Sequence, residues 1–311
     1  MEVAKVQFML GRIYYQLDEN EKARDIFEKV LAFSVKEYPE DDYNIGDVLL
    51  ELGQVYSDLN EKKKASELLE QSLAIHIKNY GEGHFEVAEV QFILGRIYYQ
   101  MDENEKARDI FEKVLAFSVK KYPEDDHNIG DVLLELGQVY SDLNEKKKAS
   151  ELLEQSLAIH IKTYGEEHQE VILVKYKLAE VYYQLDENEK ARDLFECALT
   201  FFVKNLEPDN QNIAEVQYQL GRIYSELGEP EKAKESLESS LAIHIKTYGE
   251  EHQEVAIVKY FLGDVYCKLD IKNKAFVILN EAKVIALAKL GEESKLTKKI
   301  EGLLNACGGS N

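Results

Sequence analysis

The chain has 311 residues, of which 38 are basic and 59 acidic, so its formal net charge is −21. A charge of this sign disfavours nucleic acids and anionic membrane surfaces as partners, because their phosphates would be repelled. No apolar run approaches the roughly 20 residues that a bilayer span requires, and MEVAKVQF at the start reads as helix rather than as a targeting signal. We therefore expect a cytoplasmic protein that binds neither nucleic acid nor membrane.

The first part of the chain predicts two consecutive helices. Between Val3 and Leu17 apolar residues recur every three or four positions, which is the spacing of one helix face. Asp18 interrupts that pattern and, with Glu21 three residues later, predicts a capping box at the start of the next helix. The second helix is expected from about Glu21 to Glu37, before Pro39 ends it.

This pair of helices recurs along the whole sequence. A glycine returns every 42 residues, with leucine one position before it, tyrosine three after and alanine twelve after. The glycines are Gly11, Gly53, Gly95, Gly137, Gly221 and Gly263, and Ala179 stands at the fifth position of the series. A fixed period of this length indicates an array of one supersecondary unit rather than one globular core.

Two of these units form a longer block. Residues 3–84 and 87–168 differ at seven positions, such as Met9 against Ile93 and Tyr43 against His127. We call each such pair of units a cassette. Identity at this level indicates either recent duplication or a constructed array.

The sequence predicts an all-α solenoid of seven antiparallel helix pairs and a terminal capping helix, forming a single array over residues 1–311. Even-numbered units are expected to end at glycines with positive φ, namely Gly81, Gly165 and Gly249. The expected repeats are 2–43, 44–85, 86–127, 128–169, 170–211, 212–253 and 254–291, and the capping helix is 292–306. Such a cap suits the last apolar edge of an array.

A glycine inside a helix costs about 1 kcal/mol relative to alanine, so its recurrence calls for a packing reason. We expect the small residue twelve positions later, Ala23 or Ala65, to lie against the backbone at Gly11 or Gly53. A large side chain in place of Gly95 should then push the two helices apart.

The sequence predicts no catalytic, metal or cofactor site. His76, His160 and His244 recur at one position of the second helix, and His84, His168 and His252 recur in a loop. A catalytic group would occur once, so we interpret the loop histidines as caps or surface residues. The cysteines Cys197, Cys267 and Cys307 lack metal-type spacing and cannot all pair, which argues against a disulfide framework.

The recurring Leu10, Gly11, Tyr14 and Ala23, with Phe27 on the second helix, resemble the tetratricopeptide repeat signature. The 42-residue length and the loop YGEEHQEV from Tyr164 resemble the longer repeats of kinesin light chains. The resemblance implies a right-handed superhelix whose first helices line the concave side. It also implies a non-catalytic scaffold that binds a protein or peptide there.

If the resemblance holds, side chains exposed on the first helices would contact the partner. These candidates are Arg12, Tyr15, Gln54, Arg96, Tyr99, Gln138, Tyr183 and Arg222. The arginines would steer acidic partners, or they would only pair with neighbours such as Asp47 or Glu51. Phe8, Phe92 and the signature tyrosines are interpreted as core residues.

Two other functions stay open at this point. One is a ligand- or peptide-sensing regulatory module, which would need a separate effector domain. The other is a designed or duplicated structural spacer without a cognate partner, which the near-identical cassettes favour. We expect a monomer, with end-to-end stacking as the alternative.

Overall fold

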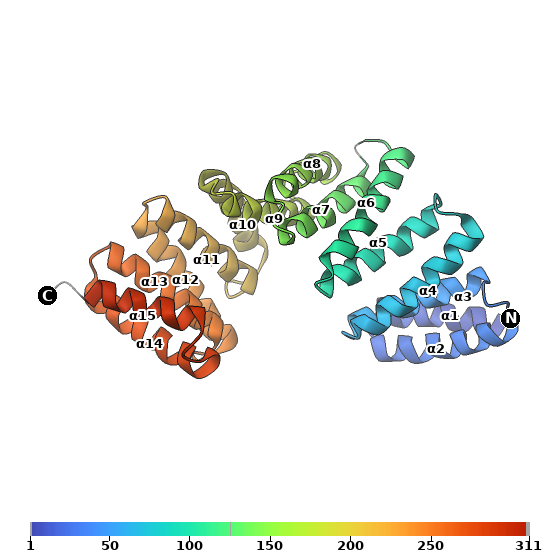
Figure 1. Ribbon diagram of the computed structural model, residues 1–311, viewed down its shortest axis with the longest axis horizontal. Helices are drawn as coiled ribbons and strands as arrows, with labels where there is room; N and C mark the ends of the chain where they lie inside the picture. Colours follow the sequence, from blue (N-terminus) through green and yellow to red (C-terminus); the bar gives the residue numbers. More distant parts are fainter. Residues whose placement is uncertain (1, 125, 309–311) are drawn as a thin grey trace. The chain divides into compact units, whose positions relative to one another are not determined.

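The computed structural model describes residues 2–124 and 126–308, and within them it contains fifteen α-helices and no strand. Consecutive helices pack as antiparallel pairs joined by short loops (Figure 1). The all-α solenoid of helix pairs is thus confirmed. The residues fall into two compact units, one up to Thr163 and one from Tyr164 on, and each is described by itself. That they form a single right-handed array stays a prediction.

Unit 1 holds four helix pairs. The first helices of its pairs are α1 (Glu2–Gln16), α3 (Tyr43–Asp58), α5 (Phe85–Gln100) and α7 (His127–Asp142). The second helices are α2 (Asn20–Glu37), α4 (Lys62–Tyr80), α6 (Asn104–Lys121) and α8 (Lys146–Tyr164), the last of which ends at the first residue of unit 2.

Unit 2 holds three pairs and the terminal helix. Its first helices are α9 (Gln169–Gln184), α11 (Gln211–Glu226) and α13 (Gln253–Lys268). Its second helices are α10 (Asn188–Asn205), α12 (Pro230–Tyr248) and α14 (Lys272–Leu290), and they are followed by α15 (Lys295–Gly308). Ile300 of α15 is fully buried against Leu279, Ala282 and Ala286 of α14. The terminal helix therefore caps an apolar edge, as the sequence predicts.

A disulfide joins Cys267 on α13 to Cys307 on α15, with 6.1 Å between the two Cα atoms. The argument against disulfides is wrong for these two cysteines, although the three do not all pair. They lie 40 residues apart in sequence, and they meet because α15 packs back against α13. Cys197 is free and accepts a hydrogen bond from Lys175 Nζ at 3.3 Å.

The turn inside each pair contains a residue in the left-handed region, and the predicted capping box is wrong. Asp18 has φ 56°, and the cap residue of α2 is Glu19, whose side chain makes no capping hydrogen bond. The same turn recurs every 42 residues, at Asn60, Asp102, Asn144, Asp186, Gly228 and Asp270. Asp, Asn and Gly are the residues that tolerate this conformation.

The recurring glycine makes room mainly for a large side chain of the second helix. A Cβ placed on Gly11 would lie 2.7 Å from Phe27 Cε1, and one on Gly53 would lie 2.7 Å from Leu69 Cγ. Phe27 and Leu69 are both fully buried. Close approach of the two helices is therefore the reason for the glycine. The nearest side chain is sixteen positions later, and at Gly53 the expected alanine also contributes, since Ala65 O would lie 3.4 Å from the added Cβ.

The ends of the longer second helices agree with the sequence. Gly81, Gly165 and Gly249 have φ of 83°, 85° and 85°. The loop histidines that follow are N-caps of the next helix, since the side chain of His84 accepts a hydrogen bond from the Glu86 amide at 3.3 Å. His168 and His252 act in the same way, so their interpretation as caps is confirmed.

Candidate binding face

The eight predicted site residues all lie on first helices, and none of them is buried. We call the exposed side of α1, α3, α5 and α7 the first-helix face of unit 1; it carries Arg12, Tyr15, Gln54, Arg96, Tyr99 and Gln138. The corresponding side of α9, α11 and α13 is the first-helix face of unit 2; it carries Tyr183 and Arg222. Successive first helices contact each other within each unit.

Arg12 and Arg96 are each paired with a glutamate on the next first helix. Arg12 Nε lies 3.1 Å from Glu51 Oε1, and Arg96 Nε lies 3.2 Å from Glu135 Oε1. Glu51 is the neighbour named from the sequence as an alternative to partner contact. Burial raises the pKa of Glu51, the Arg12 guanidinium opposes this, and the Glu89 and Asp47 carboxylates add to it. These two arginines already have a counter-charge.

Arg222 has a different environment, because Phe261 occupies the position of Glu51 and Glu135. Its guanidinium lies over the rings of Tyr183, Tyr218 and Phe261, at 4.6, 5.3 and 5.1 Å from their centroids. It donates hydrogen bonds to Tyr183 Oη at 3.1 Å and to Gln219 Oε1 at 2.9 Å. Within the described residues no carboxylate lies at ion-pair distance from Arg222, so its charge is balanced only at longer range.

The tyrosines on this face hydrogen-bond to acids on the next first helix. Tyr183 donates to Glu226 Oε1 at 2.5 Å. Burial and this bond together raise the pKa of Tyr183 to about 12. Burial also raises the pKa of Tyr15, and a hydrogen bond with Asp58 adds to the effect. These side chains are therefore fixed in position and neutral at physiological pH.

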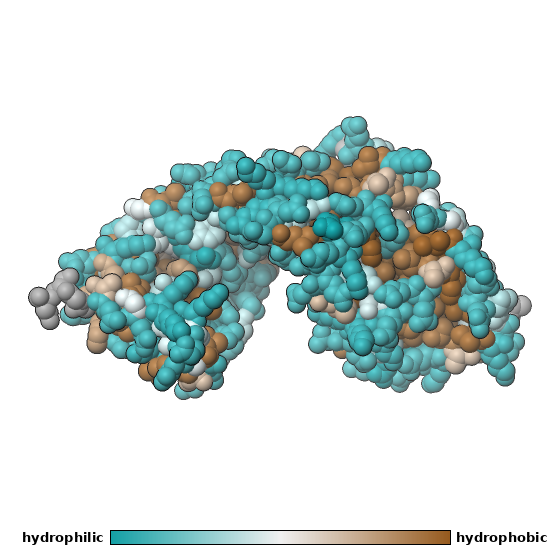
Figure 2. All heavy atoms as spheres, viewed as in Figure 1, coloured by the Kyte–Doolittle hydropathy of each residue, from teal (hydrophilic) through white to brown (hydrophobic). Residues whose placement is uncertain are grey.

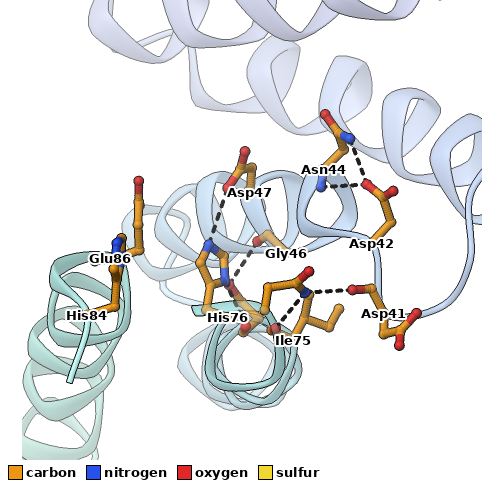
Figure 3. A network of polar contacts seen from close by, with 11 residues as sticks. Asp41, Asp42, Asn44, Gly46, Asp47, Ile75, His76, His84 and Glu86 are labelled. Atoms are coloured by element: carbon orange, nitrogen blue, oxygen red, sulfur yellow. Dashed lines mark hydrogen bonds and ion pairs between the residues drawn. The ribbon is translucent and has the colours of Figure 1, made fainter. Parts of the chain in front are cut away.

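A buried histidine lies behind the face in each cassette, and Figure 3 shows the first of them. His76 Nδ1 donates to the Ser72 carbonyl oxygen at 2.8 Å. The other ring nitrogen, Nε2, lies 3.2 Å from Asp47 Oδ1. Ser72 Oγ donates to the Gly46 carbonyl at 2.8 Å. Burial lowers the pKa of His76, but the Asp47 carboxylate and the Ser72 carbonyl outweigh it and raise the pKa overall.

The Ser, His and Asp of this network do not form a hydrolytic triad. The serine hydroxyl faces Nδ1 while the carboxylate faces Nε2, and the hydroxyl proton is given to a backbone carbonyl. Ser72 and His76 are also fully buried, so no substrate could reach them. The network instead fixes Asp47, and His160 fixes Asp131 at 3.1 Å in the second cassette. Among the described residues no cluster of acids, histidines and cysteines suits a metal ion.

An open pocket recurs at the same register in the two cassettes and again in residues 170–253, which we call the third cassette. Each pocket lies between an odd-numbered pair and the first helix of the next pair. We name the pockets after the aromatic residue three positions before the repeat glycine: the Phe8, Phe92 and Tyr176 pockets. Their volumes are about 260, 290 and 280 Å³. Each is lined by an asparagine and an acid from the neighbouring helix, which are Asn44 and Asp47, Asn128 and Asp131, and Asn212 and Glu215.

The sequence analysis missed these pockets. Phe8 and Phe92 were expected in the core, but they are half-buried. One side of each ring packs edge-on against Phe27 or Phe111, at 5.6 and 5.7 Å between centroids, and the other side lines a pocket. Figure 2 shows hydrophobic side chains gathered in patches over the N-terminal helices, within a mainly hydrophilic surface. The 84-residue recurrence of an aromatic residue with an acid 39 positions later is the signal that could have found them.

Comparison with known families settles the relationship of the repeats. The profile of the tetratricopeptide repeat family matches residues 2–78, 63–118, 86–162, 170–246 and 212–283. The chain belongs to the tetratricopeptide repeat family. Proteins of this family are typically interaction scaffolds rather than enzymes. No curated protein matched the chain, and none of the described helices is both long and apolar enough to cross a bilayer.

Several solved structures are similar to this tetratricopeptide repeat chain. A Podosopora anserina protein, described as a kinesin light chain with nearly identical TPR-like repeats, is 27% identical over 64% of this chain and 94% of its own, with a TM-score of 0.57. BtubC (BKLC) from P. vanneervenii is 22% identical over 76% and 92%, with a TM-score of 0.58. The apo form of RapI is 17% identical over 97% and 100%, with a TM-score of 0.68. The kinesin-light-chain-like character of the repeats is thus confirmed, and the last two matches support the fold.

Proposed function

We propose that this protein is a non-catalytic scaffold that binds a peptide or a helical segment of another protein along its first-helix faces. The observation that carries the proposal is the recurrence of one open, aromatic-lined pocket at the same register in every cassette. A segment lying along a first-helix face would place successive side chains in successive pockets. Aromatic residues and arginines of the kind found beside them dominate protein interfaces.

The three arginines contribute unequally in this proposal. Arg12 and Arg96 each have a glutamate beside them, so an acidic partner would compete with an existing ion pair. Arg222 is held by three rings and has no ion pair among the described residues. We therefore propose Arg222 as the residue that attracts an acidic group of the partner, with Tyr183 holding it in place.

The test is a selection of peptides from a phage-displayed dodecapeptide library against the full chain. It is run in parallel on an Arg222→Ala variant and on a variant with both Arg12→Ala and Arg96→Ala. Enriched peptides should bind the Arg222→Ala variant at least about tenfold more weakly than the wild-type protein, because the variant cannot form an ion pair with an acidic group in this partly buried site. They should lose about twofold or less on the double variant.

A selection that enriches no peptide on any of the three proteins would count against the scaffold proposal. It would favour a structural spacer, which the near-identical cassettes support as the second candidate. Equal losses on the two variants would leave peptide binding in place but contradict the special role of Arg222.

A further inference from the structure

The three pockets have similar volumes and equivalent places in the repeat, but they differ in charge. The residue six positions before the repeat glycine is Lys5 in the first cassette, Glu89 in the second and Leu173 in the third, and each lines its pocket. Lys5 against Glu89 is also one of the seven differences between two otherwise identical cassettes. The side chain at this one position therefore changes the charge of the pocket from one cassette to the next.

The Phe92 pocket has two carboxylates above an aromatic lining. Glu89 of α5 and Asp131 of α7 both line it, and Phe85, Phe92, Phe117 and Tyr122 are among its other lining residues. Phe117 and Tyr122 meet edge to face, with 6.4 Å between ring centroids. Asp131 is held in place by His160. Burial raises the pKa of Glu89, with the Glu86 carboxylate as the next cause, so negative charge here is incompletely balanced.

A buried hydroxyl completes the pocket. Ser118 is 3% exposed and lines the pocket. Its backbone carbonyl accepts a bond from the Tyr122 amide at 2.9 Å, and its side chain contributes a hydroxyl to the pocket lining. A donor entering the pocket could therefore form a hydrogen bond with this hydroxyl.

Building on the function proposed above, we infer that the Phe92 pocket is the site for a lysine or arginine side chain of the partner. The aliphatic stem would pack on the aromatic rings, which also attract a cation through their faces. The charged end would meet Glu89 and Asp131 and donate to the Ser118 hydroxyl.

The two related pockets suit this occupant less well. The Phe8 pocket has the equivalent serine, Ser34, and the equivalent acid, Asp47, but Lys5 adds a positive charge at the rim. The Tyr176 pocket is lined by two carboxylates, those of Glu170 and Glu215, but Lys177 also lines it, and Phe202 stands in place of the serine. Among these three pockets, only the Phe92 pocket combines two carboxylates and a serine hydroxyl with a lining that has no lysine or arginine.

The two pockets of unit 1 can be compared within one molecule, by titrating the full chain with n-hexylammonium and following valine methyl resonances. Val132 reports on the Phe92 pocket and Val48 on the Phe8 pocket, since each lines its own. The Val132 methyls should respond at about tenfold lower concentration of n-hexylammonium than the Val48 methyls. The Phe92 pocket should bind the cation more tightly because it offers more aromatic rings and a second carboxylate. Neutral 1-hexanol, with the same chain, should shift both equally.

Two charge variants provide matched controls. Glu89→Lys gives the Phe92 pocket the rim charge of the Phe8 pocket and should abolish the preference for the ammonium ion. Lys5→Glu makes the reciprocal change and should bring the response of Val48 to that of Val132. Both substitutions install a residue that the equivalent position already holds, so the fold is expected to be retained, and circular dichroism checks this.

Equal responses of Val132 and Val48 to n-hexylammonium, or a preference that survives Glu89→Lys, would overturn the inference. The result is independent of the peptide selection. Enriched peptides without a pocket preference would leave the scaffold proposal standing and remove this inference. A clear preference of n-hexylammonium for the Phe92 pocket without enriched peptides would support this inference and count against the scaffold proposal.

Discussion

Phe111 packs directly on the backbone of Gly95. A Cβ on Gly95 would lie 2.8 Å from Phe111 Cε1, closer than two carbon atoms can approach. We predict that Gly95→Leu lowers the free energy of unfolding of unit 1 by several kcal/mol through overpacking, measured by urea denaturation. Gly302→Leu on α15 is the control, because no atom lies within 4 Å of a Cβ there, and it should change stability little.

Alanine at the same position should be far milder. The fifth repeat already holds Ala179 opposite Phe195, and both are buried. We predict that Gly95→Ala changes stability by less than about 1 kcal/mol, because better helix propensity offsets the shift of the ring. A loss as large as that of Gly95→Leu would contradict the packing explanation.

The left-handed turn residue of each pair provides a second prediction. Asp102 has φ 59° and Gly228, at the equivalent position, has φ 76°. Asp102→Gly should therefore stabilise unit 1 by up to about 1 kcal/mol, because glycine has no penalty there. Gly228→Ala should destabilise unit 2 by about 1 kcal/mol or more. Calorimetry of the two variants checks both signs, and a destabilising Asp102→Gly would argue against the assigned conformation.

The His76 and Asp47 pair predicts a pH dependence. The pKa of His76 is raised in the folded state. The stabilisation that protonated His76 gives is therefore fully present below its pKa in the unfolded chain, about 6.5. That contribution is lost as the pH rises through the folded pKa. Asp47→Asn should thus cost more stability at pH 5.5 than at pH 8.5, measured by urea denaturation at each pH. The variant Glu82→Gln, in an exposed loop, is the control; a cost of Asp47→Asn that is equal at both pH values would contradict the prediction.

Reduction of the Cys267–Cys307 disulfide should loosen α15. The cross-link closes a loop of 40 residues, and bonds of this kind contribute roughly 2–4 kcal/mol. We predict faster hydrogen exchange of α15 amides in dithiothreitol and in Cys307→Ser, with Cys197→Ser as the control. A thiol assay on the folded, unreduced protein should find one free cysteine; finding three would mean that the disulfide does not form.

The sequence predicted the helices well because glycine, leucine and tyrosine recur in phase, and each marks a fixed place in the pair. It did not reveal which residue fills the space beside the glycine, since periodicity shows that Ala23 and Phe27 are both buried but not how their side chains point. Likewise, aspartate at position 18 is compatible both with an N-cap and with a left-handed turn residue. The sequence alone cannot choose between these roles, and the backbone φ of 56° shows the second.

For the candidate site, the pairing of Arg12 with Glu51 could be named in advance because both are charged and lie one repeat apart. Arg222 could not, since its surroundings depend on three rings from three helices. The pockets and the Cys267–Cys307 contact also depend on how neighbouring helices pack, which a single repeat does not encode.

The Lys5 and Glu89 difference has a consequence for how a long ligand would be held. Two identical pockets in one unit would accept the same segment in two positions, displaced by one cassette, and neither would be preferred. Opposite charges at equivalent places remove that degeneracy, so a bound chain with one basic residue has a single favoured alignment and a defined direction. The near-identical cassettes repeat one surface, and the Lys5 and Glu89 difference would let a ligand distinguish the two copies.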